Sequence, residues 1–213
     1  MNDHKVYVIG LNDWRKLRLG DITISALTEI PELSGKGIEE FYKGNLCMFA
    51  RSSINEIYSW GHNKYGKLGR GFESYERLKA EKIDFFDDKN IIDIKNGTSH
   101  SLALSYDGKV YGWGDNEKAQ VDLCQPGVKC VCVPLLIDFK VPIKFIHCQD
   151  YNSFAVDITG NAYYWGEYVN QITPKKMIIK GVKKIQKNFI YFIVLKENGD
   201  ISINDNSKFT TLQ

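Results

Sequence analysis

Four copies of a short glycine-containing phrase constrain the fold of this chain more than any other feature of its sequence. The phrases are VYVIGLN, IYSWGHN, VYGWGDN and AYYWG. Their glycines lie 51, 53 and 52 residues apart and are Gly10, Gly61, Gly114 and Gly166. A period of about fifty residues is typical of propellers and solenoids, in which each repeat is one supersecondary unit.

A second pattern predicts a β-hairpin in each repeat. Short apolar runs are separated from the strands that follow them by the dipeptides Asp107-Gly108, Thr159-Gly160 and Asn198-Gly199. Such dipeptides close tight hairpins. Two further strand-like stretches in each repeat bring the count to four, which is the count of a propeller blade. They are Leu27 to Leu33 and Ile38 to Tyr42, Arg77 to Phe86 and Asn90 to Asn96, Val131 to Phe139 and Ile143 to Cys148, and Thr173 to Ile179 and Lys183 to Lys187.

The sequence therefore predicts an all-β fold, a β-propeller of four-stranded blades in a small or incomplete ring. One domain of 213 residues is expected, with repeats at about 6–56, 57–109, 110–161 and 162–200. Ile201-Ser202-Ile203 begins a further strand and a polar tail follows it. If the ring is open, its edge strands are expected to favour self-association, because an unpaired strand edge is a template for pairing.

The repeated residues are interpreted as structural. The tryptophans before the last three glycines, Trp60, Trp113 and Trp165, are expected to pack within the blades rather than to stack on a ligand. Gly61→Val is expected to destabilise the fold by roughly 2 kcal/mol or more if that position needs a positive φ or a close backbone approach.

IYSWGHNKYGKLGRG, VYGWGDN and GTSHSLALSYDGKVYGWG resemble the repeats of the regulator of chromosome condensation family. The resemblance implies a propeller of four-stranded blades and guanine nucleotide exchange on a small Ran-like GTPase. The first repeat, VYVIGLNDWRKLRLGD, is also similar to the opening blade of the subgroup that joins such a propeller to a BTB domain. The family propeller has seven blades whereas four repeats are present here, and no BTB-like segment follows residue 200.

The segment GHNKYGK matches the glycine and lysine positions of a phosphate-binding loop, but the fit ends there. Leu68 stands where that loop needs a Ser or Thr to bind Mg²⁺. Gly69 and Gly71 would interrupt the helix that must follow. We therefore predict no bound nucleotide or other cofactor.

Neither a metal centre nor a catalytic dyad is predicted. The spacing of Cys124, Cys130 and Cys132 does not match paired zinc ligands, although His147 and Cys148 follow nearby. His100 stands beside Ser101, but Asn152-Ser153 occupies the equivalent place in the next repeat. The position is thus a feature of the repeat, in which a polar side chain ties strand to loop.

The loops that follow the glycine phrases are the predicted partner-binding surface. The candidate residues mix aromatic and charged side chains, a composition typical of interface hot spots; they are Trp14, Arg15, His62, Lys64, Tyr65, Asp115 and Glu117. We interpret the chain as a protein-interaction platform or adaptor rather than an enzyme. The alternative is a guanine nucleotide exchange factor or regulator of a small Ran-like GTPase, and a ubiquitin-ligase component is another candidate partner.

Net charge and hydropathy argue against nucleic acid and membranes as partners. The net charge of +2 argues against a dedicated nucleic-acid binder. The N-terminus MNDHK has no secretory pattern, and the longest apolar run, Phe189 to Leu195, is too short to cross a bilayer. The expected location is the cytoplasm or the nucleus, with no membrane contact.

Overall fold

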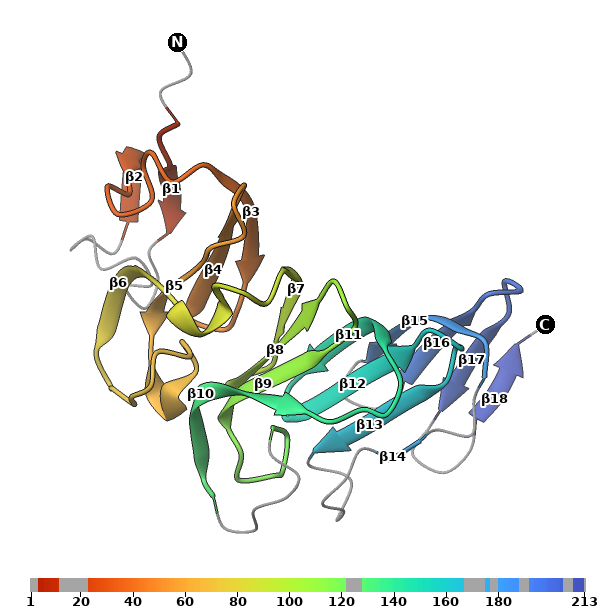
Figure 1. Cartoon of the computed structure of the whole chain (residues 1–213). Coiled ribbons are helices and arrows are strands. Elements are labelled where there is room, and N and C mark those ends of the chain that lie inside the picture. Colours follow the sequence, from red (N-terminus) through yellow and green to blue (C-terminus); the bar gives the residue numbers. More distant parts are fainter. Residues whose placement is uncertain are drawn as a thin grey trace.

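The computed structural model describes residues 4–11, 23–121, 128–166, 175–176, 180–187, 192–204 and 209–212. Within these residues the strands form four antiparallel sheets of four strands each and one sheet of two strands (Figure 1). Two 3-10 turns, η2 (Lys64–Gly66) and η3 (Asp84–Phe86), are the only helical elements of the described chain. The prediction of an all-β fold built from four-stranded sheets is confirmed.

Each four-stranded sheet is a run of consecutive strands. The first contains β3 (Ile38–Lys43), β4 (Cys47–Ser52), β5 (Ile57–His62) and β6 (Arg77–Lys82). The second contains β7 (Ile91–Asn96), β8 (His100–Ser105), β9 (Val110–Asp115) and β10 (Cys130–Ile137). The third contains β11 (Ile143–Gln149), β12 (Asn152–Asp157), β13 (Ala162–Gly166) and β14 (Lys175–Lys176). The fourth contains β15 (Val182–Lys187), β16 (Phe192–Lys196), β17 (Ile201–Asn204) and β18 (Phe209–Leu212), and the small sheet pairs β1 (Tyr7–Leu11) with β2 (Thr23–Glu29).

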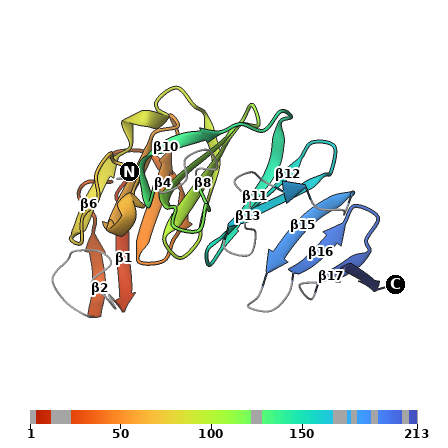
Figure 2. The same ribbon diagram turned by 90° about the horizontal axis from the view of Figure 1, so that it is seen from below.

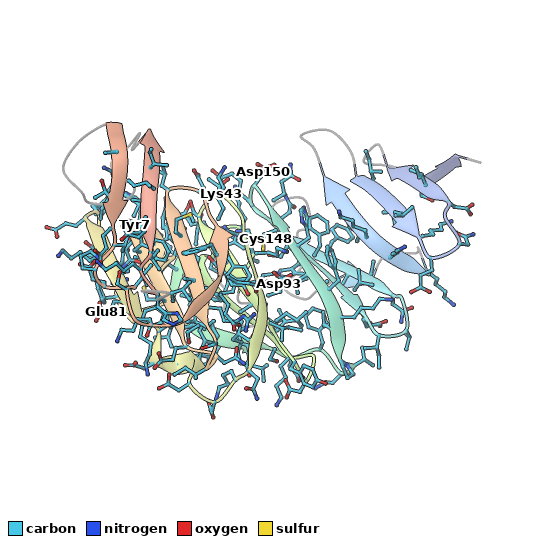
Figure 3. The ribbon with its side chains drawn as sticks, turned by 90° about the horizontal axis from the view of Figure 1, so that it is seen from above. Tyr7, Lys43, Glu81, Asp93, Cys148 and Asp150 are labelled. Carbon is cyan, nitrogen blue, oxygen red and sulfur yellow. The ribbon has the colours of Figure 1, made fainter. Side chains whose placement is uncertain are left out.

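The sheets follow one another around an arc, as the blades of a propeller do (Figure 2). Their first strands lie on the inner side, where β11 contacts both β7 and β15. In Figure 3, Asp93 of β7 and Cys148 of β11 accordingly lie toward the middle of the arc, while Glu81 of β6 lies on its outer side. The β1–β2 hairpin and the β15–β18 sheet stand at opposite ends and do not pair. The described residues therefore form an incomplete ring.

Apolar side chains fill the space between neighbouring sheets. Between the first and second, Phe49 and Phe86 both meet the ring of Trp113 edge to face, with centroids 5.8 and 5.5 Å away. A second cluster around Trp165 joins the second and third sheets, and a third around Phe154 joins the third and fourth. Edge-to-face aromatic pairs add to the stabilisation from burial itself. Each blade is therefore held mainly by its neighbours, as in other repeat proteins.

The sheets are out of step with the sequence repeats. The repeat 57–109 supplies β5 and β6 to the first sheet and β7 and β8 to the second. The glycine phrases with Gly61, Gly114 and Gly166 thus form the third strand of a sheet, and the turn at Asp107-Gly108 joins the second and third strands of one sheet. The strand expected at Ile201 is β17, and the predicted polar tail contains a further strand, β18.

Two predicted strands extend well beyond the observed ones. The stretch expected to run to Leu33 ends at Glu29, because the chain turns after Ile30 and the Leu33 N–H donates to the Ile30 carbonyl (3.1 Å). The stretch expected to run to Phe86 ends at Lys82, where η3 replaces extended chain and buries Phe86 in the first core. Of the stretch Thr173 to Ile179, only the two residues of β14 are described.

Two of the repeated tryptophans tie neighbouring blades together through their indole N–H groups. Trp113 Nε1 donates to the carbonyl of Lys67 (2.8 Å), and Trp165 Nε1 donates to the carbonyl of Gln120 (2.9 Å). Both acceptors belong to the loop after the third strand of the preceding sheet. Trp60 Nε1 is buried with no hydrogen-bond partner among the described residues.

Replacing Trp113 by phenylalanine is expected to lower the free energy of unfolding by about 1–3 kcal/mol, since the buried Lys67 carbonyl loses its donor. Trp60→Phe is the matched control and should have a smaller effect. Chemical denaturation of the two variants measures the difference. Equal effects would show that the tryptophans act by ring packing alone.

Candidate functional site

The repeated glycine brings two loops of each blade together at one end of the sheet. Gly61 has φ +103°, and a Cβ there would lie 2.6 Å from the Leu46 carbonyl oxygen. That carbonyl accepts a hydrogen bond from the His62 N–H (2.8 Å). Gly114 repeats the arrangement against Ser99, with φ +103°. The loop before the second strand therefore packs against the start of the loop that leaves the third strand, an approach only glycine allows.

A repeated asparagine shapes the loop that leaves the third strand. In the first sheet, Asn63 Oδ1 accepts from the Leu68 N–H (3.1 Å) and Asn63 Nδ2 donates to the Phe72 carbonyl (2.8 Å). Asn116 makes the equivalent bonds to Val121 and Val128 in the second sheet. These side chains close the loops on themselves, which is why IYSWGHN and VYGWGDN share their last residue.

These loops enclose a hollow of about 370 Å³ on one face of the arc. We call it the face hollow. It is bordered by the loops before the second strands and after the third strands of the first two sheets, and by the loop before β12 of the third. Its lining residues are Asn45, Leu46, His62, Lys64, Tyr65, Lys67, Thr98, Ser99, Asp115, Glu117, Lys118 and Tyr151.

Five of the predicted partner-binding residues line the face hollow: His62, Lys64, Tyr65, Asp115 and Glu117. Trp14 and Arg15 lie outside the described residues. Lys67, Tyr151 and the lining residues that precede the second strands were not predicted as binding residues. Most of them could have been found from the pairing of the glycine phrase. The residue paired with each glycine is the first residue of the second strand, and a lining loop directly precedes it.

The match to known proteins agrees with this architecture. Residues 55–104 and 91–120 match the regulator of chromosome condensation (RCC1) repeat. The chain carries RCC1 repeats. The match confirms the resemblance found in the sequence, while the similarity of the first repeat to the subgroup with a BTB domain stays a prediction.

The curated relatives that this chain matches are larger proteins. The human X-linked retinitis pigmentosa GTPase regulator is 32% identical over 146 residues, covering 68% of this chain and 14% of the regulator. The human E3 ubiquitin-protein ligase HERC2 is 30% identical over 121 residues, covering 56% of this chain and 2% of the ligase. The structure of Prp20p from Saccharomyces cerevisiae superposes with a TM-score of 0.74 at 16% identity, over 94% of this chain and 53% of Prp20p. The chain thus spans about half of that solved propeller and a small part of these two relatives.

Both signs of charge meet in the face hollow of this RCC1-repeat chain. Burial raises the pKa of Asp115, which is 3% exposed and accepts a hydrogen bond from the Glu117 N–H (3.0 Å). Burial and the positive charges of neighbouring side chains lower the pKa of His62. The Lys64 ammonium lies 4.6 Å from the centre of the Tyr65 ring, so this pair presents a cation and an aromatic face together.

His100 makes no dyad with Ser101. Ser101 Oγ donates to Asn96 Oδ1 (2.7 Å), whereas His100 Nε2 lies 2.9 Å from Ser153 Oγ in the next blade. His100 is 1% exposed, so no substrate reaches it. Its contact differs from the predicted tie between strand and loop, because it joins β8 to β12 across the gap between two sheets.

The cysteines of the described chain are all free. Cys47 and Cys148 are buried, and the Sγ atoms of Cys130 and Cys132 lie 4.0 Å apart. Across the part of the chain that the structure describes, no three side chains of the metal-binding types gather. Cys124, the remaining cysteine, lies outside it.

A search of the described residues for membrane-crossing helices finds none of sufficient length and apolar character.

Proposed function

We propose that this chain is a protein-interaction platform and that its partner binds at the face hollow. The observation that supports this most directly is the convergence of loops from three successive blades on one surface, with an aromatic ring, cations and carboxylates at its border. Loops held by a rigid scaffold are the usual location of binding residues. Aromatic and charged groups in such a concave place are typical of interface hot spots.

The names of relatives indicate two classes of partner. The first is a small GTPase, since one relative is called a GTPase regulator. The second is a component of a ubiquitin ligase, since HERC2 is itself such a ligase. In either case the chain acts by binding, and guanine nucleotide exchange is the alternative activity. We propose that the protein functions in the cytoplasm or the nucleus.

Affinity capture from cell lysate tests the proposal when the bait is compared with two tyrosine variants. Tyr65→Ala alters the border of the face hollow, while Tyr106→Ala alters an exposed residue in the β8–β9 turn at the opposite end of the second sheet. We expect Tyr65→Ala to reduce recovery of the specific partners about tenfold, the effect of losing a hot-spot aromatic residue. Tyr106→Ala should leave their recovery unchanged. Partners lost equally from both variants, or from neither, would contradict binding at the face hollow.

The alternative activity has its own measurement. An exchange factor binds the nucleotide-free GTPase better than the loaded one, so a chelator that removes Mg²⁺ should increase capture of a GTPase. Accelerated release of labelled GDP from Ran by sub-stoichiometric amounts of the chain would establish exchange. A set of partners indifferent to the chelator, together with an unchanged release rate, supports the platform.

A further inference from the structure

Lys67 is a buried cation in the lining of the face hollow. It lies directly after η2 and is only 4% exposed. Its backbone is fixed, because its carbonyl accepts the Trp113 indole N–H (2.8 Å). Its side chain crosses to the neighbouring loop, where Nζ donates to the Asn45 carbonyl (2.6 Å).

The Lys67 ammonium has no counter-ion among the described residues. Many surface lysines have one, such as Lys79, whose Nζ lies 2.9 Å from Glu32 Oε1. The Cys47 thiol could offset this charge only as a thiolate, but burial raises its pKa to about 11, so it is neutral. Burial in turn lowers the pKa of Lys67. An ammonium has three N–H donors, and the Asn45 carbonyl takes one.

This arrangement is unfavourable in the free protein and favours the binding of an anion. A buried charge without a partner is destabilising, and an incoming opposite charge with hydrogen-bonding capacity removes that penalty. A carboxylate accepts several hydrogen bonds, and three residues with hydroxyl groups, Thr98, Ser99 and Tyr151, line the same hollow. The volume of about 370 Å³ is sufficient for one side chain and the backbone beside it.

The two carboxylates of the hollow disfavour anions of higher charge. Asp115 and Glu117 line the same space as the three lysines Lys64, Lys67 and Lys118. They repel any anion, and they repel a phosphoryl group, with about two negative charges at neutral pH, more than a carboxylate with one.

We propose that Lys67 is the anchor of the face hollow and binds a carboxylate of the partner protein, either an acidic side chain or a C-terminal carboxylate. This inference rests on the proposed function and specifies the chemistry of the partner segment. Lys64 and Tyr65 then contact the flanking residues of that segment.

Short blocked peptides test the chemistry on the unaltered chain. The probes are acetyl-Gly-Glu-Gly-amide, its Gln and phosphoserine counterparts, and acetyl-Gly-Gly-Gly with a free carboxylate. Nuclear magnetic resonance follows the Lys67 ammonium and the amides of the lining loops during titration. We expect saturable shifts at Lys67 with the Glu peptide or the free C-terminus, whichever source the partner uses, and at least about tenfold weaker binding of the uncharged Gln peptide than of the carboxylate probe that binds. A Gln peptide that binds as tightly as both carboxylate probes, tighter binding of phosphoserine, or no shift with any probe would overturn the proposal.

Two lysine variants extend the test to the captured partner. Lys67→Met keeps the apolar stem and removes the charge, and Lys140→Met makes the same charge change in the exposed β10–β11 loop at the other end of the sheets. We expect Lys67→Met to lose the partner and to melt no lower than the parent, while Lys140→Met retains the partner. Partner recovery lost with Tyr65→Ala but kept with Lys67→Met would leave the platform standing and refute the carboxylate anchor. If Lys67→Met does not fold, the peptide comparison on the unaltered chain decides.

Discussion

Replacing Gly61 by valine is expected to lower the free energy of unfolding by at least about 2 kcal/mol. The residue has φ +103°, where a β-branched residue is strained, and its Cβ would lie 2.6 Å from the Leu46 oxygen and 3.0 Å from the Cys47 Cα. Both neighbours are backbone atoms, so no change of rotamer relieves the contact. Thermal and chemical denaturation measure the effect, and the melting temperature is the safer readout because repeat proteins do not always unfold in one step.

Gly199→Val separates the two causes. Gly199 also has a positive φ, +92°, but a Cβ there would meet nothing within 4 Å. Gly199→Val should therefore introduce backbone strain without a steric clash, and it should destabilise the fold less than Gly61→Val. If the two variants melt together, the close approach at Gly61 contributes nothing measurable.

Acid is expected to weaken the junction between the second and third blades through His100. Ser153 Oγ donates to the Gln120 carbonyl (2.8 Å), so it accepts a hydrogen bond from the His100 Nε2–H of the neutral ring. His100 Nδ1 is then buried with no partner. Burial lowers the pKa of His100 to about 3, below the value of about 6.5 expected in an unfolded chain. A lowered folded pKa means that the neutral ring contributes stability fully above about pH 6.5, and that this is lost as the pH falls toward 3. The slope is about 1.4 kcal/mol per pH unit.

His100→Gln isolates this contribution, since glutamine retains an N–H for Ser153 and does not titrate. Stability is measured by denaturation between pH 7 and 4 for both proteins. All other groups titrate in both, so the variant should lose stability less steeply with acid. Parallel curves would mean that His100 is not buried neutral in the folded chain.

Local sequence predicted most of the fold and less of the site. The glycine and hairpin phrases specify turns and strands through backbone preferences that act within a few residues, and these predictions agree with the sheets. The division into blades is different, because it depends on which hairpin pairs with which preceding strand. Nothing local distinguishes a repeat that begins at Ile57 from a sheet that begins at Ile38.

The face hollow shows the same limit. His62 and Asp115 were identified because they follow a repeated phrase, but Lys67 was read only as the lysine of a failed phosphate-binding motif. Its significance depends on burial and on the carbonyl of Asn45, 22 positions earlier in the chain. Neither is visible before the two loops are placed side by side.

The offset between repeats and sheets has a consequence for how such chains change length. Removing one full period, for example 57–109, would leave β3 and β4 followed directly by β9 and β10. Since β9 occupies in its sheet the place that β5 occupies in its own, those four strands can form a hybrid blade with every interior strand still paired. Loss or duplication of one sequence repeat would therefore shorten or lengthen the arc by one blade without leaving an incomplete sheet in its middle.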